Sequence, residues 1–253
     1  MPATVHLDRG VGPGVVLLHG VGAGPATFAT VADDLALDHH VLVVERPVGG
    51  GGEGGARSLD EQADQVVDLL VEERATGGAL VGVSGGATLA LAMAIRHPGV
   101  ARRLVVHEPL LGHHAPVLHQ RFAEAAAHAA AGDDATLAVV EAVMGSATWA
   151  ALDPGAREAA RAGVARWLAE IPQFAAFDPT QDELRSLVGL RLLCTVGADS
   201  GPERHAAAGV LARLAGAEVA VVPGAGNAVQ LDAPLAFAQL VRTWLALPVG
   251  ARP

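Results

Sequence analysis

Ser84 is the residue of this sequence that is best placed to act as a nucleophile. It is the centre of Gly82-Val83-Ser84-Gly85-Gly86, which matches the pattern G-x-S-x-G. The apolar run Leu80–Val83 precedes the serine, and the helical pattern Ala87–Arg96 follows it. A serine on a sharp turn from strand to helix has an exposed hydroxyl, and small neighbours make such a turn possible. The spacing therefore predicts nucleophilic attack by Ser84.

The elements that must position this serine follow an alternating pattern. Short runs rich in valine and leucine alternate with longer helical patterns, which is typical of an α/β fold with a mostly parallel sheet. The expected strands are Val15–His19, Val41–Glu45, Leu80–Val83, Leu104–His107, Leu190–Val196 and Val219–Val222, with Thr4–Leu7 as an additional edge strand. The expected helices are Ala26–Ala36, Leu59–Arg74, Ala87–Arg96, Glu203–Leu214 and Leu235–Leu245.

Between Pro109 and Leu187 the alternation stops, and an alanine-rich helical pattern takes its place. Strands resume at Leu190, so we expect one α/β core, residues 1–110 and 187–253, with a helical cap at residues 111–186. The alanines and few aromatic side chains of this segment predict an apolar pocket for a small apolar or acyl-type ligand. The expected ligand-binding residues are His113, His114 and Trp149.

An earlier segment, His19-Gly20-Val21, ends a strand and opens into a glycine-rich turn. With the serine pentapeptide and the predicted cap, this segment makes the whole chain resemble the α/β-hydrolase fold superfamily. The resemblance implies an oxyanion hole formed by the amides of Val21 and Gly85. Two such donors can each contribute about 3 kcal/mol to stabilising a developing oxyanion. His19 is then expected to have a structural role.

The resemblance also implies the order nucleophile, acid, histidine, and Ser84, Asp199 and Asn227 follow that order. Asp199 comes after a late strand and is expected to be the acid, although it could instead cap the next helix. Asn227 stands where the family has its histidine. Asparagine forms hydrogen bonds but does not titrate near neutral pH. In a model serine protease, loss of the histidine lowers turnover by about 10⁶, so ordinary ester hydrolysis should be impaired.

Other histidines could in principle supply a base. His107 ends a strand beside Glu108, and strand alternation sends these two side chains to opposite sides. His113, His114 and His119 begin the predicted cap, where solvated polar side chains are the simpler interpretation. Their spacing does not match that of metal ligands, so we expect no metal. No cofactor is expected either.

Composition excludes several classes of function. The net charge of −10 argues against nucleic acid and anionic membranes as partners. The chain has no lysine and no tyrosine, which excludes Schiff-base chemistry and the phosphate-loop lysine. The single cysteine, Cys194, cannot form an internal disulfide, and Met1 to Gly10 lacks an apolar signal core. We therefore expect a cytoplasmic protein. The oligomeric state cannot be inferred.

The 21 uncharged residues between Arg74 and Arg96 are long enough to span a membrane. Five glycines interrupt them, and Ser84 lies near their centre. A strand, a turn and a buried helix explain the segment better.

Three functions remain open from the sequence. The first is an impaired enzyme of ester, thioester or lactone hydrolase ancestry. The second is a non-hydrolytic member of the superfamily: a ligand-binding pseudoenzyme, or a lyase, isomerase or cyclase that uses the pocket and the oxyanion hole. The third is dinucleotide binding, which the glycines after His19 imitate, although the third required glycine falls at Pro25. An engineered His→Asn substitution in an active hydrolase would also give this sequence.

Overall fold

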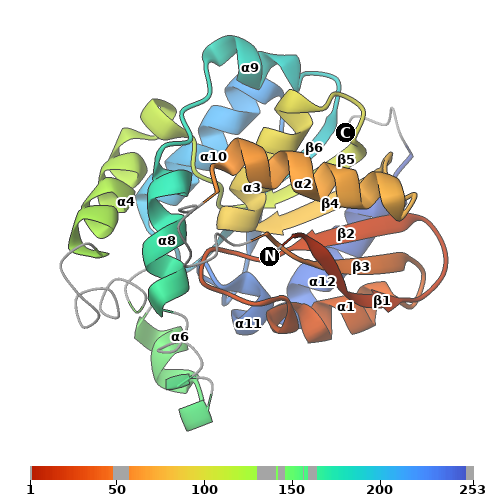
Figure 1. The fold of residues 1–253 in the computed structure, drawn as a ribbon, viewed down its shortest axis with the longest axis horizontal. Helices are drawn as coiled ribbons and strands as arrows, with labels where there is room; N and C mark the ends of the chain where they lie inside the picture. The colour runs from red at the N-terminus through yellow and green to blue at the C-terminus, as the bar shows by residue number, and fades with distance from the viewer. Residues whose placement is uncertain are drawn as a thin grey trace.

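The computed structural model describes residues 2–47, 57–129, 141, 146–155, 157–158 and 164–248. Its centre is a seven-stranded sheet in the order β1-β3-β2-β4-β5-β6-β7 (Figure 1). The edge strand β1 runs antiparallel to β3, and every other pair of neighbouring strands is parallel. The predicted α/β fold with a mostly parallel sheet is confirmed.

Strands β2 to β6 are rich in valine and leucine and are buried along most of their length, as expected for strands covered on both faces, whereas the edge strands β1 and β7 are largely exposed or half-buried. Their bounds are β1 Thr4–Arg9, β2 Gly14–Leu18, β3 His40–Glu45, β4 Gly78–Val83, β5 Ala101–His107, β6 Arg191–Gly197 and β7 Glu218–Val222. Each predicted strand is present, with ends shifted by up to three residues.

Helices connect the strands and cover both faces of the sheet (Figure 1). Those of the core are η1 Pro25–Phe28, α1 Ala29–Leu35, α2 Leu59–Glu72, α3 Gly85–Arg96, α10 Pro202–Ala215, α11 Val229–Asp232 and α12 Pro234–Ala246. Helix α2 begins at a capping box formed by Ser58 and Glu61. Helix α10 begins at Pro202 and is followed by Gly216, which has a left-handed backbone conformation. Each predicted helix is present.

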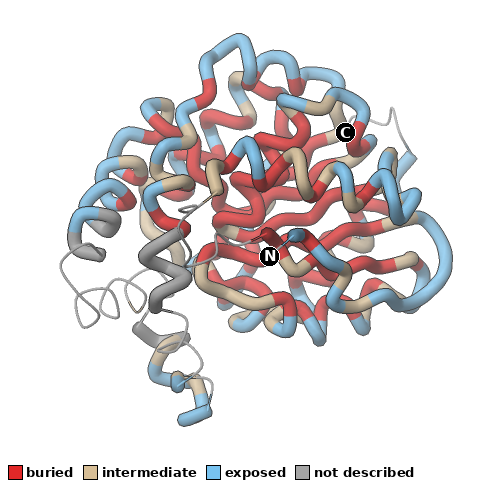
Figure 2. Tube along the Cα trace, in the orientation of Figure 1, coloured by how far each residue is buried: buried red, intermediate tan, exposed pale blue. Residues whose placement is uncertain are grey.

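The sheet separates two hydrophobic clusters. In one cluster, side chains of α2, α3 and α10 pack against one face of the sheet. In the other, side chains of α1 and α12 pack against the opposite face. Buried residues are continuous through the sheet and exposed residues lie on the outer helix surfaces (Figure 2). The segment between Arg74 and Arg96 divides into β4 and α3, as the glycines predicted. Among the described residues, no helix is long and apolar enough to cross a membrane.

Only helices lie between β5 and β6 in the part of the chain that the structure describes. They are η2 Gly112–His114, α4 Pro116–Ala129, α6 Ser146–Ala151, α8 Val164–Ala175 and α9 Gln181–Ser186. Helices α4 and α8 pack against each other beside the sheet (Figure 1). A glycine-rich segment, Gly49 to Gly55, and the stretch Gly132-Asp133-Asp134 lie outside the described residues.

Candidate active site

Ser84 occupies a strained turn between β4 and α3. Its backbone has φ 54° and ψ −118°, a conformation that costs energy for a residue with a side chain. A Cβ atom at Gly82 would lie 2.3 Å from the Gly86 carbonyl oxygen, and one at Gly86 would lie 2.0 Å from the Leu18 carbonyl oxygen. Glycine is therefore required at both positions, because the turn brings backbone against backbone.

The segment after β2 lies directly against this turn. A Cβ atom at Gly85 would lie 2.9 Å from the Val21 amide nitrogen, and one at Gly20 would lie 3.4 Å from the Ser84 Cβ. Gly85 is the first residue of α3, and the N-terminus of a helix stabilises negative charge. The structure thus brings together Ser84, Val21 and Gly85, which the sequence predicts to be the nucleophile and the two oxyanion-hole donors.

His19 is fully buried behind this segment. Its Nδ1 lies 3.0 Å from the Gly20 carbonyl oxygen, and the Arg46 amide donates to its Nε2 at 3.3 Å. A ring held by two backbone groups and buried from solvent is in a structural position.

Glu108 is a buried carboxylate that the sequence did not single out as an acid. It follows β5 with φ 51°, so the chain turns sharply as it leaves the strand. Its Oε1 accepts a hydrogen bond from the Gly197 amide at 2.9 Å and another from the Ser200 hydroxyl. Its Oε2 lies 3.2 Å from the Arg204 Nε. The carboxylate is therefore held on both oxygens.

Asn227 is bound to this carboxylate. Its Nδ2 donates to Glu108 Oε2 at 2.9 Å. The side chain of Asp199, by contrast, is exposed and makes no hydrogen bond or ion pair within the described part of the chain. The carboxylate bonded to Asn227 is therefore that of Glu108, which the sharp turn after β5 brings to this position, and the role of Asp199 as the acid stays a prediction. An acidic residue at the end of the strand next to β4 was the sequence signal for it.

Electrostatics keeps Glu108 ionised. Burial alone would raise the pKa of its carboxyl group, but the neighbouring Arg204 guanidinium and the Ser200 and Gly197 donors on Oε1 lower it below its usual value. Burial also lowers the pKa of Arg204, which faces the same carboxylate. The site thus contains a fixed negative charge behind Asn227.

His107 is not in a position to act as a base for Ser84. Its side chain is completely buried, and burial lowers its pKa. Its Nε2 donates to the Gly226 carbonyl oxygen at 3.0 Å, and its Nδ1 lies 3.0 Å from the Thr195 hydroxyl. A neutral ring with both nitrogens engaged fixes the loop that carries Asn227.

The Alpha/beta hydrolase family model matches residues 15–240 of the chain. The chain belongs to the α/β hydrolase family. The match covers both the strand–turn–helix at Ser84 and the loop at Asn227.

Several known proteins are similar to this chain. Pimeloyl-[acyl-carrier protein] methyl ester esterase of Chromobacterium violaceum is 38% identical over 98 residues, which cover 38% of this chain and 37% of that esterase. The crystal structure of a thermophilic esterase from Thermogutta terrifontis is 20% identical and covers 96% of this chain and 92% of its own, with a TM-score of 0.75. MenH from S. aureus is 16% identical and covers 97% and 98%, with a TM-score of 0.73. The chain spans about two fifths of the curated relatives that it matches.

The expected ligand-binding residues lie in two places. His113 Nδ1 is 2.5 Å from Asp178 Oδ1, and His114 Nε2 donates to the Pro179 carbonyl oxygen at 2.9 Å. These bonds join the start of the helical insertion to the segment that leaves it. Trp149, on α6, is half-buried and packs against the larger hydrophobic cluster.

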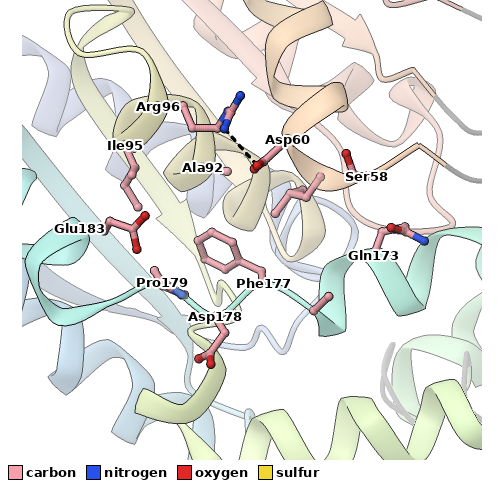
Figure 3. A pocket seen from close by; sticks show the side chains of 12 residues that line it. Ser58, Asp60, Ala92, Ile95, Arg96, Gln173, Phe177, Asp178, Pro179 and Glu183 are labelled. Atoms are coloured by element: carbon pink, nitrogen blue, oxygen red, sulfur yellow. Dashed lines mark hydrogen bonds and ion pairs between the residues drawn. The ribbon is translucent and has the colours of Figure 1, made fainter.

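A cavity of about 300 Å³ lies beside the C-terminal end of α3, between α2, α8 and α9 (Figure 3). Its α3 residues, Ala92 to Arg96, are about 12–18 Å along the helix from Ser84. Its charged side chains bind one another or neighbouring groups: Arg96 pairs with Asp60, Asp178 with His113, and Glu183 caps α9. This cavity is therefore separate from the serine.

Proposed function

We propose that this protein binds a small ester-type acyl substrate and that Ser84 forms a covalent acyl intermediate, which is hydrolysed slowly. The observation that carries the proposal is the combination of an intact strained turn at Ser84 with a non-titrating Asn227 in front of a buried Glu108 carboxylate. The turn and the Val21 and Gly85 amides support attack on a carbonyl.

In the proposed reaction, Ser84 Oγ forms a bond to the acyl carbon, and the bond from that carbon to the leaving alcohol oxygen breaks. The hydroxyl proton goes to water and the leaving oxygen takes a proton from water, because Asn227 cannot carry it. Hydrolysis of the acyl-serine needs a water molecule to be deprotonated, and Asn227 cannot accept that proton either. The acyl-enzyme should accumulate.

The names of the relatives favour ester cleavage as the reaction. The curated relative from Chromobacterium violaceum is an esterase for the methyl ester of a pimeloyl group on an acyl-carrier protein. A simple acyl ester is therefore the substrate class to test first. We expect an apolar acyl chain to lie toward the inserted helices, which would act as a cap over Ser84.

The test is intact-protein mass after incubation with p-nitrophenyl butyrate, whose leaving group departs without a proton. The unsubstituted chain should gain one butyryl group that is absent from the Ser84→Ala variant. The Asn227→His variant should release nitrophenol continuously and accumulate less adduct. No adduct on the unsubstituted chain, together with no turnover by Asn227→His, would reject acyl transfer.

One observation favours a second candidate function, a non-hydrolytic binding site. Asn227 uses its Nδ2 on Glu108, and its Oδ1 has no partner in the described part of the chain. A ligand hydroxyl or amide could donate to this oxygen. Under this alternative, Asn227→Ala should weaken ligand binding while Ser84→Ala leaves it unchanged, and equal binding by both variants would exclude it.

A further inference from the structure

A buried ion pair joins the inserted helix α8 to the core. Arg46 Nη2 lies 2.9 Å from Glu170 Oε2, and the two side chains are 0% and 1% exposed. Arg46 follows β3, whereas Glu170 lies on α8. Because a charge buried without its partner is strongly unfavourable, the two side chains hold α8 against the core.

Both members of this pair also bind the segment that carries the proposed oxyanion donor. Arg46 Nη2 donates to the Gly20 carbonyl oxygen at 2.9 Å, and Glu170 Oε2 accepts from the Gly22 amide at 3.3 Å. The Gly20 carbonyl and the Val21 N–H belong to one peptide group, which is planar and trans. Fixing the direction of that carbonyl therefore fixes the opposite direction of the Val21 N–H.

The surroundings of the guanidinium restrict it further. Its Nη1 donates to Gln62 Oε1 at 3.1 Å, and its central carbon lies 5.2 Å from the centre of the Phe174 ring. A Cβ atom at Gly85 would lie 3.3 Å from the same ring. Arg46 Nε is buried and has no hydrogen-bond partner among the described residues. The position of the guanidinium is thus determined by the contacts of its two Nη atoms.

We propose that Arg46 and Glu170 are positioning residues that orient the Val21 amide, so that the oxyanion hole is complete only while α8 lies against the core. The role of the Val21 amide as an oxyanion donor rests on the proposed function. The orientation of the Gly20–Val21 peptide by the ion pair is independent of that function.

The first experiment uses the double variant Arg46→Met/Glu170→Met. Replacing both members of a buried ion pair by apolar side chains is often tolerated, so this variant should stay folded. Hydrogen exchange of the Ala23 amide, which bonds to the Gly20 carbonyl at 3.3 Å, should become at least about tenfold faster. The Ala23 amide donates to the Gly20 carbonyl oxygen and not to either substituted side chain. Faster exchange therefore reports a change in the orientation of the Gly20–Val21 peptide. Unchanged exchange in the folded variant would overturn the inference.

The second experiment measures labelling of Ser84 by a fluorophosphonate in the Asn227→His background. Adding Glu170→Gln should lower the maximal labelling rate at least about tenfold and leave the half-saturating concentration nearly unchanged, since oxyanion donors act in the transition state. Glu124→Gln, on the exposed face of α4, is the matched control and should label normally. An equal rate for Glu170→Gln would contradict positioning. If no chain labels, the proposed function fails, and the Ala23 exchange alone decides the inference.

Discussion

Asn227 Nδ2 lies 2.9 Å from Glu108 Oε2, and that carboxylate is held by Gly197, Ser200 and Arg204 at the same time. The hydrogen-bond acceptor that a base at position 227 would need is therefore present, and position 227 itself holds an amide. A histidine at position 227 would find a buried, ionised carboxylate in front of it.

We expect the activity of the Asn227→His variant to depend on Glu108. With Glu108→Gln added, ester turnover should fall by roughly 10²–10⁴, since removal of a triad carboxylate has effects of this size. Asp199→Asn in the same background is the matched control and should change turnover less than threefold. Steady-state kinetics with p-nitrophenyl butyrate would measure both. A larger loss with Asp199→Asn would make Asp199 the acid, as the sequence alone suggested.

Glu108 should also stabilise the fold in a pH-dependent way. Glu108→Gln leaves Arg204 buried without its charged partner and should lower the free energy of unfolding by roughly 2–4 kcal/mol at pH 7. The folded-state pKa of Glu108 is below its usual 4.5, so this stability is fully present above pH 4.5 and is lost as the pH falls through the folded-state value.

Urea unfolding of the two proteins between pH 7 and pH 3 would test this. The difference between their unfolding free energies should be constant down to about pH 4.5 and narrow below it. A difference that is the same at pH 7 and pH 3 would show that Glu108 contributes no ionisation-linked stability.

Cys194 should be unreactive in the folded protein. The thiol is buried in β6, and burial, together with the charge of Glu108, raises its pKa to about 12. Because only the thiolate reacts quickly, a chromogenic disulfide reagent at pH 8 should modify no thiol in the native chain and one in urea. Rapid modification of the native chain would contradict the position of β6 in the sheet.

The strained turn should tolerate no side chain at Gly86. A Cβ atom there would approach the Leu18 backbone oxygen to 2.0 Å, so Gly86→Ala should destabilise the protein by more than about 2 kcal/mol. Gly209→Ala is the control: Gly209 is exposed on α10, and a Cβ atom there would contact nothing. It should raise stability by about 0.5–1 kcal/mol. Thermal unfolding would measure both, and similar melting temperatures would refute the packing of the turn.

The sequence by itself determined the fold and the position of the serine. Runs of valine and leucine at regular intervals predict a parallel sheet from local burial alone, and the pattern around Ser84 needs only a strand, a turn and a helix. The absence of a histidine at position 227 is likewise a fact of the sequence, since no fold can give asparagine a titrating group.

Only the tertiary structure decided which groups surround the site. Glu108 reaches Asn227 because a turn with φ 51° ends β5 beside β4, and such a turn leaves no clear pattern in the sequence. Arg46 and Glu170 are separated by 124 positions and meet because α8 packs against the core. Long-range pairs of this kind depend on how elements pack against one another, which local composition and periodicity do not encode.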